Sequence, residues 1–211
     1  MANDLRPVTP AITQSLPRHL AKLASSLGTV KWPGQPMRHH LPGGWELSEA
    51  QRSEAKVLLG ELEAAINGTY LGPQNAAKAR LTLLTKMLLS YPVPGDASEA
   101  AAAARLDLYD DALSDMPPWA LDAALKRWSR GECGHLGMGT LNYTFAPAPA
   151  ILRRLCLNEI EPLQDQVRKL TRLLAAVSID RAMDPTPIQA RPDLSIVDHT
   201  GRRLAVGLKR I

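Results

Sequence analysis

Residues 150–177 read AILRRLCLNEIEPLQDQVRKLTRLLAAV, and this stretch decides the fold class. Its apolar side chains recur at alternating spacings of four and three, at Cys156, Ile160, Leu163, Val167, Leu170, Leu174 and Val177. This spacing places all of them on one stripe of a helix, which we call the heptad seam. The seam predicts a long helix that opens after the segment Phe145–Pro149, extends to about Met183 and bends at Pro162. A seam of this length either joins two copies as a homodimer or packs on the chain's own body.

Five further helices are predicted on the amino-terminal side of this stretch. They are expected over residues 9–27, 48–67, 73–90, 98–113 and, after two prolines in the first turn, up to about residue 130. Ser48 followed by Gln51 fits a capping box, and Asn67-Gly68 ends the same helix. The helix over 73–90 is rich in leucine, so we expect it near the centre of the core. In the first helix, Pro17 is expected either to kink the helix or to lie in its first turn.

The composition supports a helical class. The chain has 211 residues, is 45% hydrophobic and only 4% aromatic, and its commonest residues are alanine and leucine. Both lose little side-chain entropy in a helix, whereas a β-sandwich or barrel favours β-branched and aromatic residues. We therefore expect an all-α helical bundle with a long C-terminal helix and flexible termini. The expected organisation is an N-terminal helix with a Pro/Gly-rich linker in 1–47, the bundle in 48–183, and a basic tail in 184–211, either a short hairpin or disordered.

Positive charge is concentrated at both ends of the chain. The net charge is +4, and it divides into +4 over residues 1–42, −3 over 43–184 and +3 over 185–211. Basic ends of this kind bind phosphate backbones through counterion release. They also occur as solvated extensions that keep a protein soluble, and neither end has the dense run of like charge typical of a dedicated arm. The charge pattern leaves both interpretations open.

Several classes of protein are excluded by simple counts. No run of about 18 apolar residues is present, so no transmembrane helix is expected. The N-terminal residues have no apolar segment of the kind found in signal peptides, and the expected location is the cytoplasm of a bacterial host. The two cysteines, Cys133 and Cys156, are too few for a disulfide scaffold or a four-cysteine zinc site.

The sequence shows no motif for catalysis. Walker, zinc-protease and Gly-x-Ser-x-Gly signatures are absent. Asp107 and Asp111, four residues apart, would share a helix face and hold Mg²⁺, but an acidic surface balanced by nearby basic residues is the simpler interpretation. Cys133 and His135 in a glycine-rich loop have no third residue to orient them, so an exposed thiol is expected. We therefore predict no enzyme activity, no cofactor and no metal, including at the pair His39-His40 in the linker.

One stretch, about residues 91–155, resembles a small helical family of phage proteins, the helicase loader/inhibitor proteins. The residues that carry this resemblance are Tyr91-Pro92, Tyr109, Leu113-Ser114-Asp115-Met116-Pro117, Ala120, Ala124, Trp128 and Phe145-Ala146-Pro147-Ala148-Pro149. The loop over 131–143 is longer than the family's connector, and the helices before residue 90 are additional. The prolines punctuate helices, and Trp128 and Phe145 are expected to fill the core.

This resemblance implies a non-catalytic adaptor in phage-type DNA replication that binds a replicative DNA helicase. Members of the family contact the helicase mainly through a flexible C-terminal part. No motif of this chain matches that part, so the expected contact residues, Arg202, Arg203, Lys209 and Arg210, rest on position and charge. Direct contact with DNA through the basic ends is a further expectation. The alternative is a dimeric DNA-binding regulatory or packaging protein, with the 156–177 heptad seam as its dimer interface.

Overall fold

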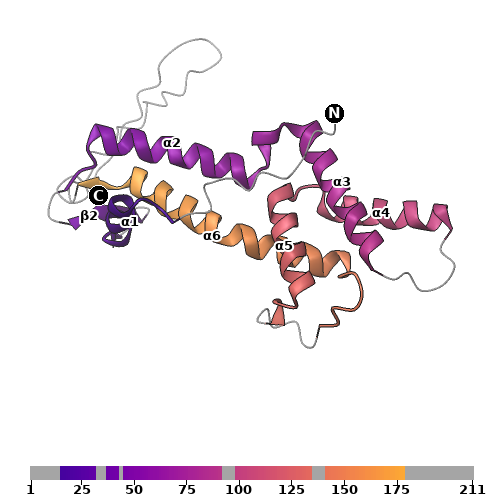
Figure 1. The fold of residues 1–211 in the computed structure, drawn as a ribbon. Helices are drawn as coiled ribbons and strands as arrows, with labels where there is room; N and C mark the ends of the chain where they lie inside the picture. The colour runs from indigo at the N-terminus through magenta and orange to yellow at the C-terminus, as the bar shows by residue number, and fades with distance from the viewer. Residues whose placement is uncertain (1–14, 32–36, 43–44, 92–97, 135–140, 179–211) are drawn as a thin grey trace, which may run out of the picture.

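A computed structural model describes residues 15–31, 37–42, 45–91, 98–134 and 141–178 (Figure 1). Its elements are α1 (Arg18–Ser25), β1 (Gly28–Val30), β2 (Arg38–Leu41), α2 (Glu49–Ile66), the 3₁₀ turn η3 (Thr69–Leu71), α3 (Pro73–Ser90), α4 (Glu99–Leu113), α5 (Pro118–Arg130), α6 (Pro149–Ala175) and β3 (Val177–Ser178). Helices dominate, so the predicted all-α bundle with its long C-terminal helix is confirmed. The basic tail, its suggested hairpin and both chain termini lie outside the described residues.

Helix α6 is the centre of the molecule. Helix α2 lies along it, α5 packs on its amino-terminal half, and α1 and α4 also contact it (Figure 1). The residues that α6 buries are Leu152, Leu155, Cys156, Ile160, Leu163, Leu170 and Leu173, and Val167 and Leu174 are partly buried against them. The heptad seam is thus buried within one chain. Of the two alternatives, a homodimer interface or packing on the chain's own body, the structure has the second. The seam is not available to a second copy in this fold.

The seam helix ends earlier than predicted. It continues through the exposed Pro162 and stops at Ala175. The chain then turns extended, and His40 of β2 pairs with Val177 of β3 in parallel. Because the strand begins at Val177, the helix does not reach Met183 as expected, and residues 179–183 lie outside the described part of the chain.

Most helix ends follow the local signals in the sequence. The Ser48 hydroxyl accepts a hydrogen bond from the Gln51 amide, and the Gln51 side chain accepts one from the Ser48 amide. This is the predicted capping box, and it stabilises the first turn of α2. Helix α3 has the predicted bounds, and α5 begins with Pro118 in its first turn and ends at Gly131 in the left-handed region, φ 71°.

The N-terminal region differs from its prediction. Helix α1 begins only at Arg18, with Pro17 as its N-cap in an extended conformation, because a proline ring fits poorly within a continuing helix. Residues 9–14 of the expected helix lie outside the described residues. The expected linker over 28–47 contains two short strands, and Leu41 and Leu47 enter the same core as α6. Trp45 does not pin this segment, since its side chain is 56% exposed; Trp32 lies outside the described residues.

Two predictions about the core are also wrong. In α3, Leu84 is buried, but Leu81 and Leu89 are exposed, so this helix lies at the edge of the bundle. The alanines at 100–104 of α4 were expected to allow close helix packing, yet all of them are exposed. At these exposed positions alanine stabilises the helix through its high helix propensity and not through packing.

Candidate partner-binding site

Four of the residues that carry the family resemblance meet between α4, α5 and the start of α6, whereas Pro92 lies outside the described residues. The Tyr109 hydroxyl donates a hydrogen bond of 2.6 Å to the carbonyl of Pro147, and the Trp128 indole donates one of 3.1 Å to the carbonyl of Phe145. Both aromatic side chains are buried. We call Tyr109, Trp128, Phe145 and Pro147 the aromatic joint. It holds the extended segment before α6 against the two preceding helices.

Phe145 occupies an unexpected place in this joint. Its backbone carbonyl accepts the bond from Trp128, but its ring is 46% exposed, whereas the sequence predicted that it fills the core. The core position beside Trp128 is taken by Tyr143, with ring centroids 4.8 Å apart and planes at 55°. The backbone of Phe145 therefore serves the fold, while its side chain is presented to solvent. An exposed aromatic ring on a rigid support is the kind of side chain that anchors a protein partner.

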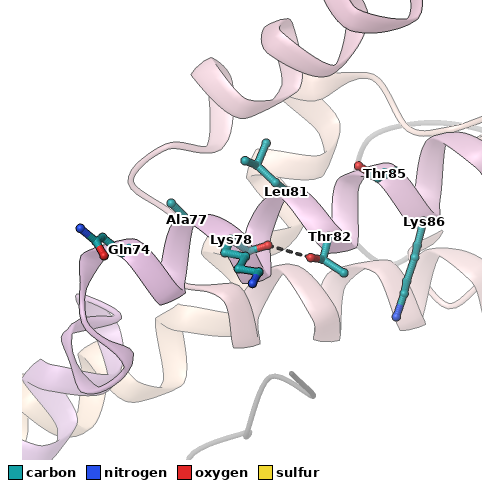
Figure 2. Close-up of a pocket in the computed structure, with 7 residues that line it drawn as sticks. All are labelled: Gln74, Ala77, Lys78, Leu81, Thr82, Thr85 and Lys86. Carbon is teal, nitrogen blue, oxygen red and sulfur yellow. Dashed lines mark hydrogen bonds between the residues drawn. The ribbon is translucent and has the colours of Figure 1, made fainter. Parts of the chain in front are cut away.

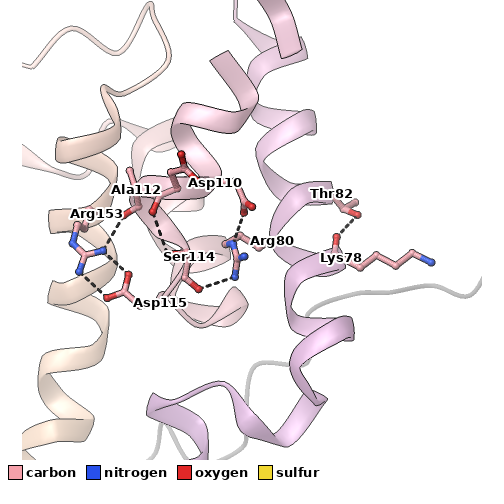
Figure 3. A network of polar contacts seen from close by, with 9 residues as sticks. Lys78, Arg80, Thr82, Asp110, Ala112, Ser114, Asp115 and Arg153 are labelled. Atoms are coloured by element: carbon pink, nitrogen blue, oxygen red, sulfur yellow. Dashed lines mark hydrogen bonds and ion pairs between the residues drawn. The ribbon is translucent and has the colours of Figure 1, made fainter. Parts of the chain in front are cut away.

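Two arginines hold the turn between α4 and α5 (Figure 3). Arg80 of α3 donates to the Asp110 carboxylate at 2.7 Å and to the Ser114 carbonyl at 3.1 Å. The Arg80 side chain is 10% exposed and that of Asp110 is 32% exposed, so the arginine is buried but its partner is partly solvated. These bonds satisfy a carboxylate and a carbonyl at the end of a helix, where backbone carbonyls lack partners of their own.

The second arginine approaches the same turn from α6. Arg153 donates to the Ala112 carbonyl at 2.8 Å and to the Asp115 carboxylate at 2.7 Å. The hydrogen bond from Arg153 lowers the pKa of Asp115 below its ordinary value. We call Arg80, Asp110, Asp115 and Arg153 the arginine clamp, because together they fix α4 to both α3 and α6.

The acidic residues of α4, of α5 and of the turn between them have different surroundings. Asp110 and Asp115 are ion-paired, Asp122 pairs with Lys126 at 2.6 Å, and Asp107 and Asp111 are exposed on α4. Within the described residues, no group of three or more His, Cys, Asp or Glu side chains is arranged to hold a metal ion. Asp110 and Asp115 thus join neighbouring elements, whereas Asp107 and Asp111, the pair considered for Mg²⁺, lie on the exposed surface of α4.

The cysteines are both buried. Cys133 was expected as an exposed thiol, but its residue is 1% exposed, and its amide donates 3.2 Å to the Tyr143 hydroxyl. Burial raises the pKa of Cys133, and burial raises the pKa of Cys156 to about 12. Both thiols are therefore protonated and unreactive at neutral pH. His135, the suggested partner of Cys133, lies outside the described residues.

Two open grooves on the surface carry opposite charge. The first, of about 650 Å³, runs along the outer face of α3 and is lined by Gln74, Ala77, Lys78, Leu81, Thr82, Thr85 and Lys86 (Figure 2). The second, of about 460 Å³, lies on α2 beside Pro17 and is lined by Ala50, Ser53, Glu54, Val57, Leu58 and Glu61. We call them the α3 groove and the α2 groove. Neither groove was predicted from the sequence, which placed the helix of Leu81 near the centre of the core.

The remaining predicted site residues are placed as follows. Arg202, Arg203, Lys209 and Arg210 lie outside the described residues. His39 and His40 lie in β2, opposite Thr29 and Gly28 of β1. No helix in the described part of the chain is long and apolar enough to cross a membrane. Comparisons with models of protein families, with curated proteins and with solved structures find no match to this chain.

Proposed function

We propose that this protein is a non-catalytic adaptor of phage-type DNA replication that binds a replicative hexameric helicase. The observation that supports the proposal is the aromatic joint. Four of the residues that carry the resemblance to the loader/inhibitor family, Tyr109, Trp128, Phe145 and Pro147, are joined there by two side-chain hydrogen bonds, one buried and one partly buried. The resemblance is better supported when its residues form one local unit than when they are dispersed over the surface.

The joint also suggests how the body would contribute to binding. It fixes the Phe145 backbone and leaves the Phe145 ring exposed beside the start of α6. We assign this ring, together with the basic tail residues Arg202, Arg203, Lys209 and Arg210, to helicase binding. An exposed aromatic anchor and a basic segment that orders on its partner would act together, with the entropy of ordering lowering the affinity of the tail.

The test is a binding assay with the purified replicative helicase of the host. The full chain is expected to co-elute with the helicase in size-exclusion chromatography and to survive moderate salt. Replacing the four basic tail residues by serine is expected to weaken binding at least tenfold without changing the helical content measured by circular dichroism. If the unaltered chain does not bind the helicase, the proposed function is wrong.

The contribution of the body is tested by Phe145→Ser. Because only the ring is removed, the Phe145 carbonyl still accepts the Trp128 hydrogen bond, and the melting temperature should change little. Binding to the helicase is expected to weaken, since an exposed aromatic anchor is lost. Trp45→Ser is the matched control, because Trp45 is similarly exposed but lies between β2 and α2, in a segment that contributes no residue to the aromatic joint. Equal binding by both variants would remove Phe145 from the site.

A further inference from the structure

The α3 groove is an apolar surface with a basic border. Helix α3 contains Lys78, Arg80 and Lys86 and no acidic residue. Arg80 is buried in the arginine clamp, whereas Lys78 and Lys86 line the groove. Leu81 at its centre is 37% exposed, and Leu89, which shares this side of the helix because it follows Lys86 by three residues and Thr85 by four, is 83% exposed.

The α2 groove has the opposite character. Glu54 and Glu61 stand on one stripe of α2, and between them lie Leu58 and Val57, which is 59% exposed. Glu54 also accepts a hydrogen bond of 2.9 Å from His19 of α1, a contact between exposed side chains. Arg52, Lys56 and Glu63, the other charged residues of α2 nearest to these glutamates, do not line the groove.

The two grooves match each other in the spacing of charge. At 1.5 Å per residue, Glu54 and Glu61 are separated by about 10.5 Å along α2, and Lys78 and Lys86 by about 12 Å along α3. Each pair of charges brackets apolar side chains of similar extent, Val57 with Leu58 on one helix and Leu81 on the other. Two helices laid side by side would therefore bring both lysines to both glutamates and cover the exposed leucine and valine.

We propose that the α2 groove of one molecule binds the α3 groove of a second copy, in a head-to-tail contact. The two grooves are different surfaces of the same chain, so each bound pair leaves one α2 groove and one α3 groove unfilled. Such a heterologous contact adds further copies, as a closed ring if the rotation between neighbours allows it and otherwise as an open chain. The contact involves one helix from each molecule, so its area is small and the association depends strongly on concentration.

The test exchanges the charges of the two grooves. One variant is Lys78→Glu with Lys86→Glu, and the other is Glu54→Lys with Glu61→Lys. Each variant alone carries two surfaces of the same sign and is expected to bind itself roughly tenfold or more weakly than the unaltered chain. Mixed in equal amounts, the two variants present opposite charges at every contact, so alternating assemblies are expected to return. Sedimentation velocity at low salt, from about 5 to 500 µM, measures the dissociation constants.

The controls separate this contact from general effects of charge and folding. Lys56→Glu and Glu63→Lys make the same kinds of charge reversal as the groove variants, but at positions of α2 that do not line the groove. His19→Ala removes the hydrogen bond to Glu54 and leaves both groove glutamates in place. All three should self-associate like the unaltered chain, and circular dichroism should show every variant folded. An unaltered chain that is monomeric at every concentration, or a mixture of the two groove variants that fails to assemble, overturns the proposal, as does unchanged assembly in either variant alone.

Discussion

The indole of Trp119 donates a hydrogen bond of 2.9 Å to the backbone carbonyl of Ala65, and both residues are almost fully buried. This bond joins the first turn of α5 to the last turn of α2, which are more than fifty residues apart in the chain. Together with the α2–α6 and α5–α6 contacts it closes a triangle of helices around the core. The α2 groove lies on one helix of this triangle, and the aromatic joint involves the other two, α5 and the segment before α6.

Trp119→Phe should lower the free energy of unfolding by about 1–3 kcal/mol, because the variant loses a buried hydrogen bond and leaves space beside Ala65. Chemical denaturation with urea measures the change. Ser129→Ala is a suitable comparison, since its hydroxyl is exposed and bonds only within its own helix, to the Lys126 carbonyl. An equal loss in the two variants would show that the Trp119 bond contributes little.

Asp115→Asn should destabilise the protein at neutral pH, and its effect should shrink as the pH falls through the lowered folded-state pKa of Asp115. The folded-state pKa of Asp115 is lowered by the Arg153 hydrogen bond, so its contribution is present above the ordinary pKa and is lost as the pH falls through the folded pKa. The carboxylate is 56% exposed, which keeps the effect small, below about 1 kcal/mol. Thermal melts over pH 2–7 test this, with the exposed and unclamped Asp107→Asn as the control. A constant difference at every pH would contradict the assigned cause.

The native protein should react with no equivalent of a thiol reagent such as DTNB at pH 8, and with two equivalents after denaturation. Both cysteines are buried and protonated, and the pKa of Cys156 is raised to about 12. Because that raised pKa favours the neutral folded form, the stability it contributes is present below the ordinary thiol pKa. It is lost as the pH rises towards 12. Rapid labelling of Cys133 in the folded state would show that its loop is open in solution.

Two glycine substitutions should act in opposite directions. Gly131→Ala should destabilise the protein by about 1 kcal/mol, because Gly131 ends α5 with φ 71°, a conformation that disfavours a side chain. Gly60→Ala should stabilise it by up to about 1 kcal/mol, because Gly60 lies inside α2 with open space where the methyl group would stand. Melting temperatures of the two variants provide the comparison. A stabilising Gly131→Ala would contradict the role assigned to the left-handed cap.

Local signals in the sequence were sufficient for most of the helical fold. The capping box at Ser48, the proline at the start of α3 and the glycine after α5 each act within one turn, so they can be interpreted without the tertiary structure. The heptad seam predicted the central helix for the same reason. Periodicity could not show whether the seam faces a second copy or the chain itself, because that depends on where α2 and α5 pack.

The features that sequence reasoning missed are those made by residues far apart in the chain. The clamp pairs Arg80 with Asp110 and Arg153 with Asp115, and no spacing rule connects such partners. The strands of three, four and two residues are too short to show an alternating pattern. Leu81 and Leu89 appeared to be core residues because a leucine-rich helix usually is buried. The signal for exposure in α3 was the pair Lys78 and Lys86, because lysines without acidic partners in the same helix are expected to face solvent.

The pairing of β3 with β2 has a consequence for how the molecule would be reached by a partner. Helix α1 follows residues 1–14, and β3 precedes residues 179–211, and both elements sit at the pole of the bundle opposite α3 and α4 (Figure 1). The positive charge of the N-terminal region lies mainly in this described part, because residues 1–14 contain one arginine and one aspartate, whereas Arg18 and Lys22 belong to α1 and Arg38 to β2. A negatively charged partner that contacts this pole would therefore meet basic residues of the folded body.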